Sequence, residues 1–559
     1  MPNLIQLLHL PQSNFLSNLD LWIVLFYAIS IFVLAQVVSR RKSDEQVSSK
    51  GYFLAGNTLP WWAIGASLIA ANISAEQIIG MSGSGYRIGL AIASYEWMAA
   101  ITLIIVGKFF LPVFLRNGVM TMPGFLEQRF GPSVKYLMAI FWLLLYVVVN
   151  LTTILWLGGT AVTTVTGIDP LIALTVLGVF ALAYQISGGL KAVALTDIVQ
   201  VSLLVLGGII IMTITLTKIG GEGGLLGGFN HLKANFPDHF HMILGKDSPF
   251  YKDLPGIAVL VGGMWIMNIS YWGFNQYIIQ RALAAKSVPE AQNGIAFAAY
   301  LKLIIPAIVV VPGMAALVLG KPELLTPPTG SADHAYPQMM TLLPNGLLGL
   351  VFVALVFAVI SSTASKINSI ATIFTLDIVA PLNRTINDQT LVTVGRVASV
   401  VAVIISILIA KPMLGKADQV FQVIQDFTGF FTPAIVVIFA LGMFWKRCST
   451  AGAFMAVAGG FLASCFFYIA SQMHATGNYL GFTNQWMATQ VPDMPFMNRV
   501  GWVFWISLAL CVLVSLIVPN KREVSTLTLE GVSFKTSTTF NVLAVGVIVI
   551  LIGLYYTFW

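Results

Sequence analysis

Charged residues are scarce in this sequence, at 9% of 559 residues, whereas ordinary soluble domains carry about 25%. Apolar residues make up 57%. A chain with so few charges cannot cover itself with polar surface, which excludes an ordinary soluble protein. Apolar runs of about 20 residues recur from Leu21 to Trp559, each long enough to cross a hydrocarbon core of roughly 30 Å as a helix. The composition therefore predicts an all-α integral membrane protein.

Metal-ligating residues are few as well. The three cysteines (Cys448, Cys465 and Cys511) show neither CxxC spacing nor a disulfide framework, and among the six histidines only His239 and His241 are close in sequence. We expect no cofactor of the chain's own. The net charge of +7 comes from Lys and Arg that flank apolar runs, without an aromatic-interleaved basic patch. Membrane lipid, and no nucleic acid, is the expected partner.

Hydropathy, turn residues and charge clusters predict about fourteen spans. They begin near residues 20, 59, 90, 134, 170, 193, 254, 293, 346, 391, 421, 450, 500 and 539. The first span is followed by Arg40, Arg41 and Lys42, which is the reverse of the charge order in a secretory signal peptide. We therefore expect a retained span with the N-terminus outside, and an even count returns the C-terminus to the same side.

Polar side chains interrupt the second span at mid-depth. The segment ANISAEQ, from Ala71 to Gln77, places amides, a hydroxyl and a carboxylate where lipid cannot satisfy them. They must face the protein interior or a wet cavity, and a helix break there would free backbone carbonyls for a cation. The alternative is close helix packing by small and polar residues.

Two isolated charges lie within other spans, Glu96 in the third and Lys302 in the eighth. An unpaired charge inside a membrane costs several kcal/mol, so each needs a partner or a wet cavity. A buried carboxylate and ammonium that share one polar ligand would meet this need. The alternative is that one or both reach the interface by snorkelling.

The seventh span, NISYWGFNQYIIQR, interleaves amides (Asn268, Asn275 and Gln276) with the rings of Tyr271 and Trp272. Carbohydrates bind to such a mixture, because hydroxyls need amide partners and an apolar sugar face stacks on a ring. An interfacial aromatic belt is the alternative interpretation.

The ninth span carries adjacent hydroxyls at Ser361 and Ser362, which suit a small hard cation. Serines that bond their own helix backbone are the alternative. Further polar groups in membrane segments are Asp197, Gln422, Gln425 and Asp426.

These stretches resemble the sodium:solute symporter family, and most closely the bacterial sodium/galactose symporters. The resemblance covers nearly the whole chain and is most specific in LPWWAIGASLIAANISAEQIIGMSGSGYRIGLAIASYEWM, LPGIAVLVGGMWIMNISYWGFNQYIIQRALAAKSVPEAQ and NSIATIFTLDI. It implies a single transporter domain over residues 1–559. Within it, two inverted five-helix repeats over 58–217 and 254–445 would form the core, with discontinuous helices at the binding site and peripheral helices over 20–40 and 450–559.

The resemblance also implies roles for individual residues. The residues that contact the sugar or support it would be Asn72, Gln77, Glu96, Asn268, Lys302 and Gln425. Tyr271 would be the inner gate, and the outer side would be closed by Met81, Tyr95 and Phe421. Sodium, the coupling ion, would bind carbonyls of Ala70, Ile73 and Ala358 and the hydroxyls of Ser361 and Ser362. Asp197 would lie near the sodium exit route.

The implied function is sodium-coupled symport of a hexose, galactose or glucose, by alternating access across a cell membrane, the inner membrane of a bacterium. Symport of an amino acid, sialic acid or inositol on the same scaffold remains an alternative. A membrane sensor or enzyme without net transport is a distant one, since no paired catalytic acid and base, metal cluster or signalling domain is found.

Three residues depart from the galactose symporter pattern. Ala99 stands where those proteins carry a serine, and Ser270 replaces a tyrosine, which leaves the identity of the sugar open. Lys366 replaces an apolar residue four positions after Ser362, on nearly the same helical face. We expect Lys366 to snorkel. The alternative is that it places positive charge on the route of the ion.

Overall fold

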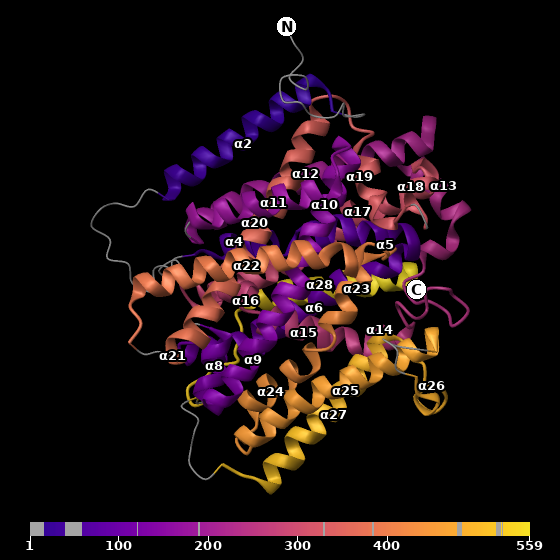
Figure 1. The fold of residues 1–559 in the computed structure, drawn as a ribbon. Coiled ribbons are helices and arrows are strands. Elements are labelled where there is room, and N and C mark those ends of the chain that lie inside the picture. Colours follow the sequence, from indigo (N-terminus) through magenta and orange to yellow (C-terminus); the bar gives the residue numbers. More distant parts are fainter. Residues whose placement is uncertain are drawn as a thin grey trace.

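The computed structural model describes residues 16–39, 59–119, 121–187, 190–327, 330–382, 385–477, 483–520, 527 and 529–559. Within these ranges only the backbone is described at 32, 34–39, 186–187, 190–198, 388 and 476. The regular elements of the described residues are helices, apart from one isolated parallel bridge between Leu59 and Ala285. Figure 1 shows a helical bundle with α2 on one flank and α25 and α27 on the opposite flank.

The principal helices of the first half of the described chain are α2 (Asn18–Ser39), α4 (Trp61–Asn72), α5 (Met81–Ile88), α6 (Ser94–Ile105), α8 (Met122–Phe130), α9 (Pro132–Leu144), α10 (Thr152–Thr166), α11 (Pro170–Ser187), α12 (Leu190–Gly220) and α13 (Gly224–Asn235). Those of the second half are α14 (Ile257–Val261), α15 (Gly263–Phe274), α16 (Gln276–Leu283), α17 (Val288–Leu319), α20 (Leu347–Thr372), α22 (Asp388–Leu414), α23 (Val420–Thr428), α24 (Thr432–Phe444), α25 (Thr450–Thr476), α27 (Phe496–Ile517) and α28 (Thr538–Phe558).

Nine helical stretches among the described residues are long and apolar enough to cross a membrane, or ten if the bent pair α23 and α24 counts as one span. The prediction of an all-α, multi-pass membrane protein is therefore confirmed. The number of stretches is smaller than the expected fourteen because several expected spans are short or broken. One example is α4, which has 12 residues. Another is the 41-residue stretch from Glu76 to Arg116, which joins the end of the second expected span to the third.

The second span breaks within the ANISAEQ segment. Helix α4 ends at Asn72, Ile73 is extended (φ −69°, ψ 106°), and a π-helical turn, η2 (Glu76–Gly80), follows before α5. The segment contains no proline, so local side-chain bonding accounts for the break. The Ser74 hydroxyl donates to the Gln77 side-chain oxygen (3.1 Å) and accepts from the Glu76 amide (3.3 Å). The break opens the helix backbone at mid-span, as expected from the sequence.

The seventh expected span is broken twice. The first break is at Gly262, between α14 and α15, and the second is at Asn275, between α15 and α16. The Asn275 side-chain oxygen accepts from the hydroxyl of Tyr146 (2.9 Å), and the Gln276 side-chain oxygen accepts from the amide of Met122 (2.7 Å). The side-chain amides of Asn275 and Gln276 thus bond the second break to neighbouring helices.

Helix α17 lies at the centre of the bundle and packs against α4, α5, α6 and α12. Glycines permit this close approach. A Cβ on Gly65 of α4 would lie 2.6 Å from the Gly294 carbonyl of α17, and one on Gly85 of α5 would lie 2.9 Å from the Val310 carbonyl. Small residues at such crossings are the usual means of close helix packing in membranes. The packing places Lys302, in the middle of α17, inside the protein.

Candidate substrate and ion site

Lys302 forms the centre of a buried polar cluster. Its side chain is 0% exposed, and its ammonium donates to a carboxylate oxygen of Glu96 on α6 and to the side-chain oxygen of Asn72 on α4. The ammonium also lies 4.9 Å from the centroid of the Trp272 ring on α15. A buried ion pair needs contacts beyond the pair itself to offset its desolvation, and here the Asn72 oxygen and the Trp272 ring supply them to the Lys302 ammonium. The structure thus contradicts snorkelling for Glu96 and Lys302.

Tyr271 joins this cluster through Asn72. The Asn72 amide donates to the Tyr271 hydroxyl (3.0 Å), which lies 2.7 Å from the hydroxyl of Tyr277. The Tyr271 ring is half-buried. One side chain, Asn72, therefore contacts both the ammonium and the residue expected to be the inner gate.

Three other expected sugar residues make no hydrogen bond to this cluster within the described part of the chain. The Gln77 side chain accepts from Ser74 of its own broken span, and the Asn268 amide donates to the Met264 carbonyl one turn earlier (3.2 Å). Gln425 lies half-buried on α23. Their participation in a sugar site stays a prediction.

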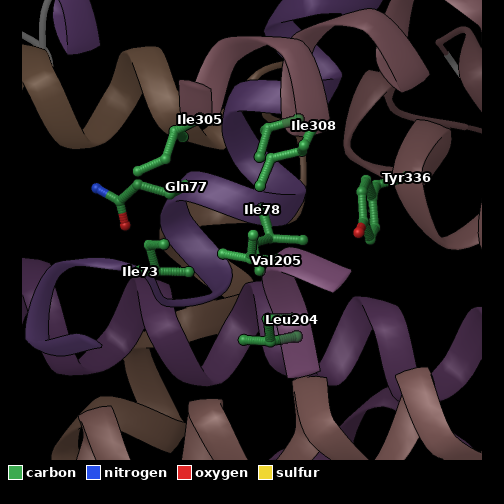
Figure 2. Close-up of a pocket in the computed structure, with 9 residues that line it drawn as sticks. Ile73, Gln77, Ile78, Leu204, Val205, Ile305, Ile308 and Tyr336 are labelled. Carbon is green, nitrogen blue, oxygen red and sulfur yellow. The ribbon is translucent and has the colours of Figure 1, made fainter. Parts of the chain in front are cut away.

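Gln77 also borders a small cavity beside the helix break (Figure 2). The cavity has a volume of about 10 Å³, which is room for about one water molecule. Most of its lining is apolar, with Ile73, Ile78, Ile305 and Ile308 among the lining residues, and the Gln77 amide points away from Tyr336 across it (Figure 2). In this structure the cavity is too small and too apolar for a sugar.

The expected outer gate residues form an aromatic contact. The rings of Tyr95 and Phe421 meet edge to face with their centroids 5.0 Å apart, and the Tyr95 hydroxyl donates to the side chain of Gln422 (3.5 Å). Met81 is fully buried at the start of α5. A Cβ on Gly80 would lie 3.1 Å from the Cβ of Phe421, so α23 lies directly against the second span.

An ion pair joins the same two segments of the chain. Arg87 lies at the end of α5, and Asp418 lies just before α23. The Arg87 guanidinium donates twice to the Asp418 carboxylate, at 2.7 and 3.0 Å, and Asp418 also accepts from the backbone amide of Ala332 (3.2 Å). We call these contacts the outer clasp, since the expected threading puts Arg87 and Asp418 on the outer side. The clasp joins three segments far apart in sequence.

Asp253 lies in the loop before α14, near the outer clasp. Burial raises the pKa of Asp253 from its usual value of 3.8 to about 6, and the Asp418 carboxylate adds to the rise. The pKa of Asp253 is therefore higher in the folded than in the unfolded protein, so the folded state is favoured when this carboxyl is protonated. This contribution to the free energy of unfolding is fully present below about pH 4 and is lost as the pH rises through about 6.

We therefore expect Asp253→Asn to raise the thermal-unfolding midpoint by a few degrees at pH 7.5 and to leave it nearly unchanged at pH 4.5. Scanning fluorimetry of the purified protein at both values measures this. Asp493→Asn is the control, because the Asp493 carboxylate pairs with the exposed ammonium of Lys252 (2.6 Å). An Asp253 effect of equal size at both pH values would contradict the assignment.

The residues expected to surround sodium are buried at the end of one helix and within another. Ala70 and Ile73 flank the end of α4, where the helix opens, and the other three residues lie on α20. All five are at most 9% exposed: Ala70, Ile73, Ala358, Ser361 and Ser362. The set combines two carbonyls beside a helix break with one carbonyl and two hydroxyls on α20, and all are oxygen ligands, which suit a hard cation. The side chain of Asp197, expected near the exit route, lies outside the described residues.

Lys366 does not snorkel, and this prediction is wrong. Its side chain is 3% exposed, and its ammonium lies 3.4 Å from a carboxylate oxygen of Glu76 in η2. The same oxygen accepts from the Thr153 hydroxyl (3.1 Å), and the ammonium lies 5.6 Å from the centroid of the Tyr277 ring. Packing of α20 against its neighbours encloses the lysine, and a buried carboxylate supplies the opposite charge. The sequence signal was present, because Glu76 and Lys366 are two opposite charges in membrane segments.

Comparisons with known proteins agree with these features. The sequence pattern of the Sodium:solute symporter family matches residues 52–460. The sodium/glucose cotransporter of Vibrio parahaemolyticus is 47% identical over 557 residues, which cover 97% of this chain and 99% of that protein. The sodium/myo-inositol cotransporter 2 of Homo sapiens is 33% identical over 465 residues, 79% of this chain and 68% of that protein.

Among solved structures, the substrate-bound, outward-open state of a Na⁺-coupled sialic acid symporter has a similar fold. The TM-score is 0.72 at 22% sequence identity, and the match covers 90% of this chain and 99% of that one. At this identity the likeness concerns the fold alone. It confirms that the helices are arranged as in a sodium-coupled symporter.

Proposed function

Since the chain belongs to the sodium:solute symporter family, and is a transporter rather than an enzyme, we propose that it carries a hexose, glucose or galactose, into the cell together with sodium. The extent of the similarity to the Vibrio sodium/glucose cotransporter, which leaves almost no part of either chain unmatched, supports the choice of solute. The expected setting is a bacterial inner membrane.

The observation that carries the proposal is the buried cluster of Lys302, Glu96 and Asn72. It brings a cationic donor, an anionic acceptor and an amide together between broken helices, beside the rings of Tyr271 and Trp272. A hexose has hydroxyls that both donate and accept, and one apolar face that stacks on a ring. Sugar hydroxyls would exchange for the direct contacts of Lys302, with Gln77, Asn268 and Gln425 as further partners.

The proposed architecture is two inverted repeats, 58–217 and 254–445, within about fourteen spans. The breaks in the second and seventh spans support it, because each proposed repeat begins with a discontinuous helix. Both termini would lie outside. The Met242 amide donates to the Phe558 carbonyl at the end of α28 (2.7 Å), which is consistent with the C-terminus sharing a side with the expected outer loop.

Sodium would couple to the sugar through the helix break. An ion held by carbonyls of α4 and hydroxyls of α20 would tie the second span to the ninth and so stabilise the arrangement that binds sugar from outside. Loss of the ion to the cytoplasm would release both helices. Sodium and sugar then raise each other's affinity, since the coupling between two bound ligands is reciprocal.

The test is uptake of radiolabelled glucose and galactose into proteoliposomes with an inward sodium gradient, compared with choline in place of sodium. We expect accumulation above equilibrium with sodium alone. Equal uptake under both conditions would contradict sodium coupling. A panel with myo-inositol, sialic acid and an amino acid tests the solute, and stronger competition by one of these than by either hexose would overturn the assignment.

The hydroxyl of Tyr271 gives a sharper prediction for the site. Tyr271→Phe removes the partner shared by Asn72 and Tyr277, and with the loss of about two hydrogen bonds we expect hexose affinity to fall roughly tenfold. Equilibrium binding of labelled hexose measures this. Tyr300→Phe is the matched control, because the hydroxyl of Tyr300 bonds the Leu543 carbonyl between α17 and α28 (3.1 Å), away from the cluster. Similar losses in both variants would rule out a specific role for Tyr271.

A further inference from the structure

The Lys366–Glu76 ion pair joins the same two parts of the chain as the proposed sodium site. Lys366 lies on α20, one helical turn after Ser362. Glu76 lies in η2, just after the break that opens the carbonyls of α4. The ion pair therefore connects the broken second span to the ninth span through protein side chains alone.

Both charges are buried, and each is the nearest opposite charge of the other. Lys366 is 3% exposed and Glu76 is 6% exposed, with 3.4 Å between the ammonium and the carboxylate oxygen. Thr153 of α10 donates to the same carboxylate oxygen (3.1 Å). Moving α20 away from η2 would strand two buried charges, which is strongly unfavourable, so the pair resists that separation.

The pair also contacts the residues next to the sugar cluster. The Lys366 ammonium lies against the ring of Tyr277, the Tyr277 hydroxyl bonds that of Tyr271, and Tyr271 bonds Asn72. A continuous set of contacts thus runs from the ion pair to the ligands of Lys302. Separation at the ion pair would disturb the inner gate.

We propose that the Lys366–Glu76 pair is a built-in tie that takes over part of the role of sodium, so that the sugar-binding arrangement forms substantially before the ion binds. This inference rests on the proposed function for its sugar readout. A preformed arrangement lets both ligands bind without first shifting the equilibrium, because the apparent affinity equals the intrinsic affinity multiplied by the fraction of protein that is competent to bind. Sugar binding should consequently depend less on sodium in the wild-type protein than in variants that lack the pair.

The competing explanation is simple charge repulsion, in which Lys366 only weakens sodium binding. The two explanations differ in sign. Under repulsion, Lys366→Met should strengthen sodium binding, Glu76→Gln should weaken it, and the double variant, which has the same net charge as the wild type, should change little. Under the tie, all three variants weaken sodium binding, because each removes the contact between η2 and α20.

The experiment measures binding of ²²Na⁺ to the purified full-length protein without sugar, and binding of labelled hexose with and without sodium. We expect the double variant to need about tenfold more sodium for half-saturation, and its hexose affinity without sodium to fall by about the same factor while its affinity at saturating sodium is kept. The double variant leaves no stranded charge, so it keeps the test valid if a single variant fails to fold. Lys135→Met is the control, since Lys135 is also a buried lysine and pairs with two carboxylates, Glu127 (2.8 Å) and Asp377 (3.3 Å), neither of which lies in η2.

The outcomes separate the inference from the proposed function. Weaker sodium binding in the double variant, with no effect of Lys135→Met, supports the tie even if no hexose binds, in which case the proposed solute is wrong. Unchanged or tighter sodium binding in the double variant overturns the tie even if hexose uptake is sodium-driven. Equal effects of the double variant and Lys135→Met would also overturn it.

Discussion

Lys302→Met should lower the initial rate of sodium-driven hexose uptake by at least about a hundredfold, because it removes the cationic donor at the centre of the proposed sugar site. It also leaves the Glu96 carboxylate buried without its partner, which destabilises the fold by roughly 3–5 kcal/mol. The variant also removes the hydrogen bond that the Asn72 side-chain oxygen accepts from the ammonium, so the Asn72 amide is held less firmly against the Tyr271 hydroxyl. Proteoliposome uptake, with rates normalised to the reconstituted protein, measures the effect.

Two variants separate loss of the site from loss of the fold. Glu96→Gln/Lys302→Met removes both charges, and we expect it to regain thermal stability without regaining uptake. Lys108→Met changes a half-buried lysine beyond the end of α6, in the π-helical turn η4 (Val106–Phe110), and its ammonium lies beside the Phe109 ring. It should keep uptake within about twofold of wild type, as expected for a change away from the site. Uptake by Lys302→Met at more than a third of the wild-type rate would contradict the central role of the cluster.

The fold follows from the sequence wherever one physical rule dominates. Backbone groups in lipid must be bonded within the segment, so the long apolar runs predicted helices correctly. The polar residues of the second span predicted a break there, and it occurs at Ile73 and Ser74. Its exact form depends on the Ser74 hydroxyl bonding to Gln77 and Glu76, a local choice that composition does not determine.

The polar contacts were harder to predict, because each joins segments far apart in the chain. Reasoning from charge alone required partners for Glu96 and Lys302, and the structure makes each the partner of the other. The pair of Lys366 and Glu76 did not follow from the sequence, because the two residues lie 290 positions apart and meet only where α20 packs near η2. The expected snorkelling of Lys366 considered the length and charge of that side chain alone, whereas its position depends on the buried carboxylate that the fold places beside it.

The outer clasp leads to the second large effect, on the balance between outward-open and outward-closed protein. Arg87→Gln removes both hydrogen bonds to Asp418 and leaves that carboxylate near the buried Asp253. Two charge-assisted bonds in a partly buried pair contribute about 1–2 kcal/mol, so we expect a roughly tenfold shift towards the outward-open form. With its outer side open more of the time, the variant should bind external hexose more tightly and turn over more slowly.

Thiol labelling detects this shift directly. In a background with Cys448, Cys465 and Cys511 changed to serine, Gln422→Cys places a thiol beside Tyr95, behind the clasp. A membrane-impermeant maleimide should label it about tenfold faster when Arg87→Gln is added, since labelling follows the open fraction. Lys252→Gln breaks a similarly short but more exposed ion pair with Asp493, so it should leave the rate unchanged. Equal acceleration by both changes would mean that general loosening of the outer loops, rather than the clasp, controls access to the site.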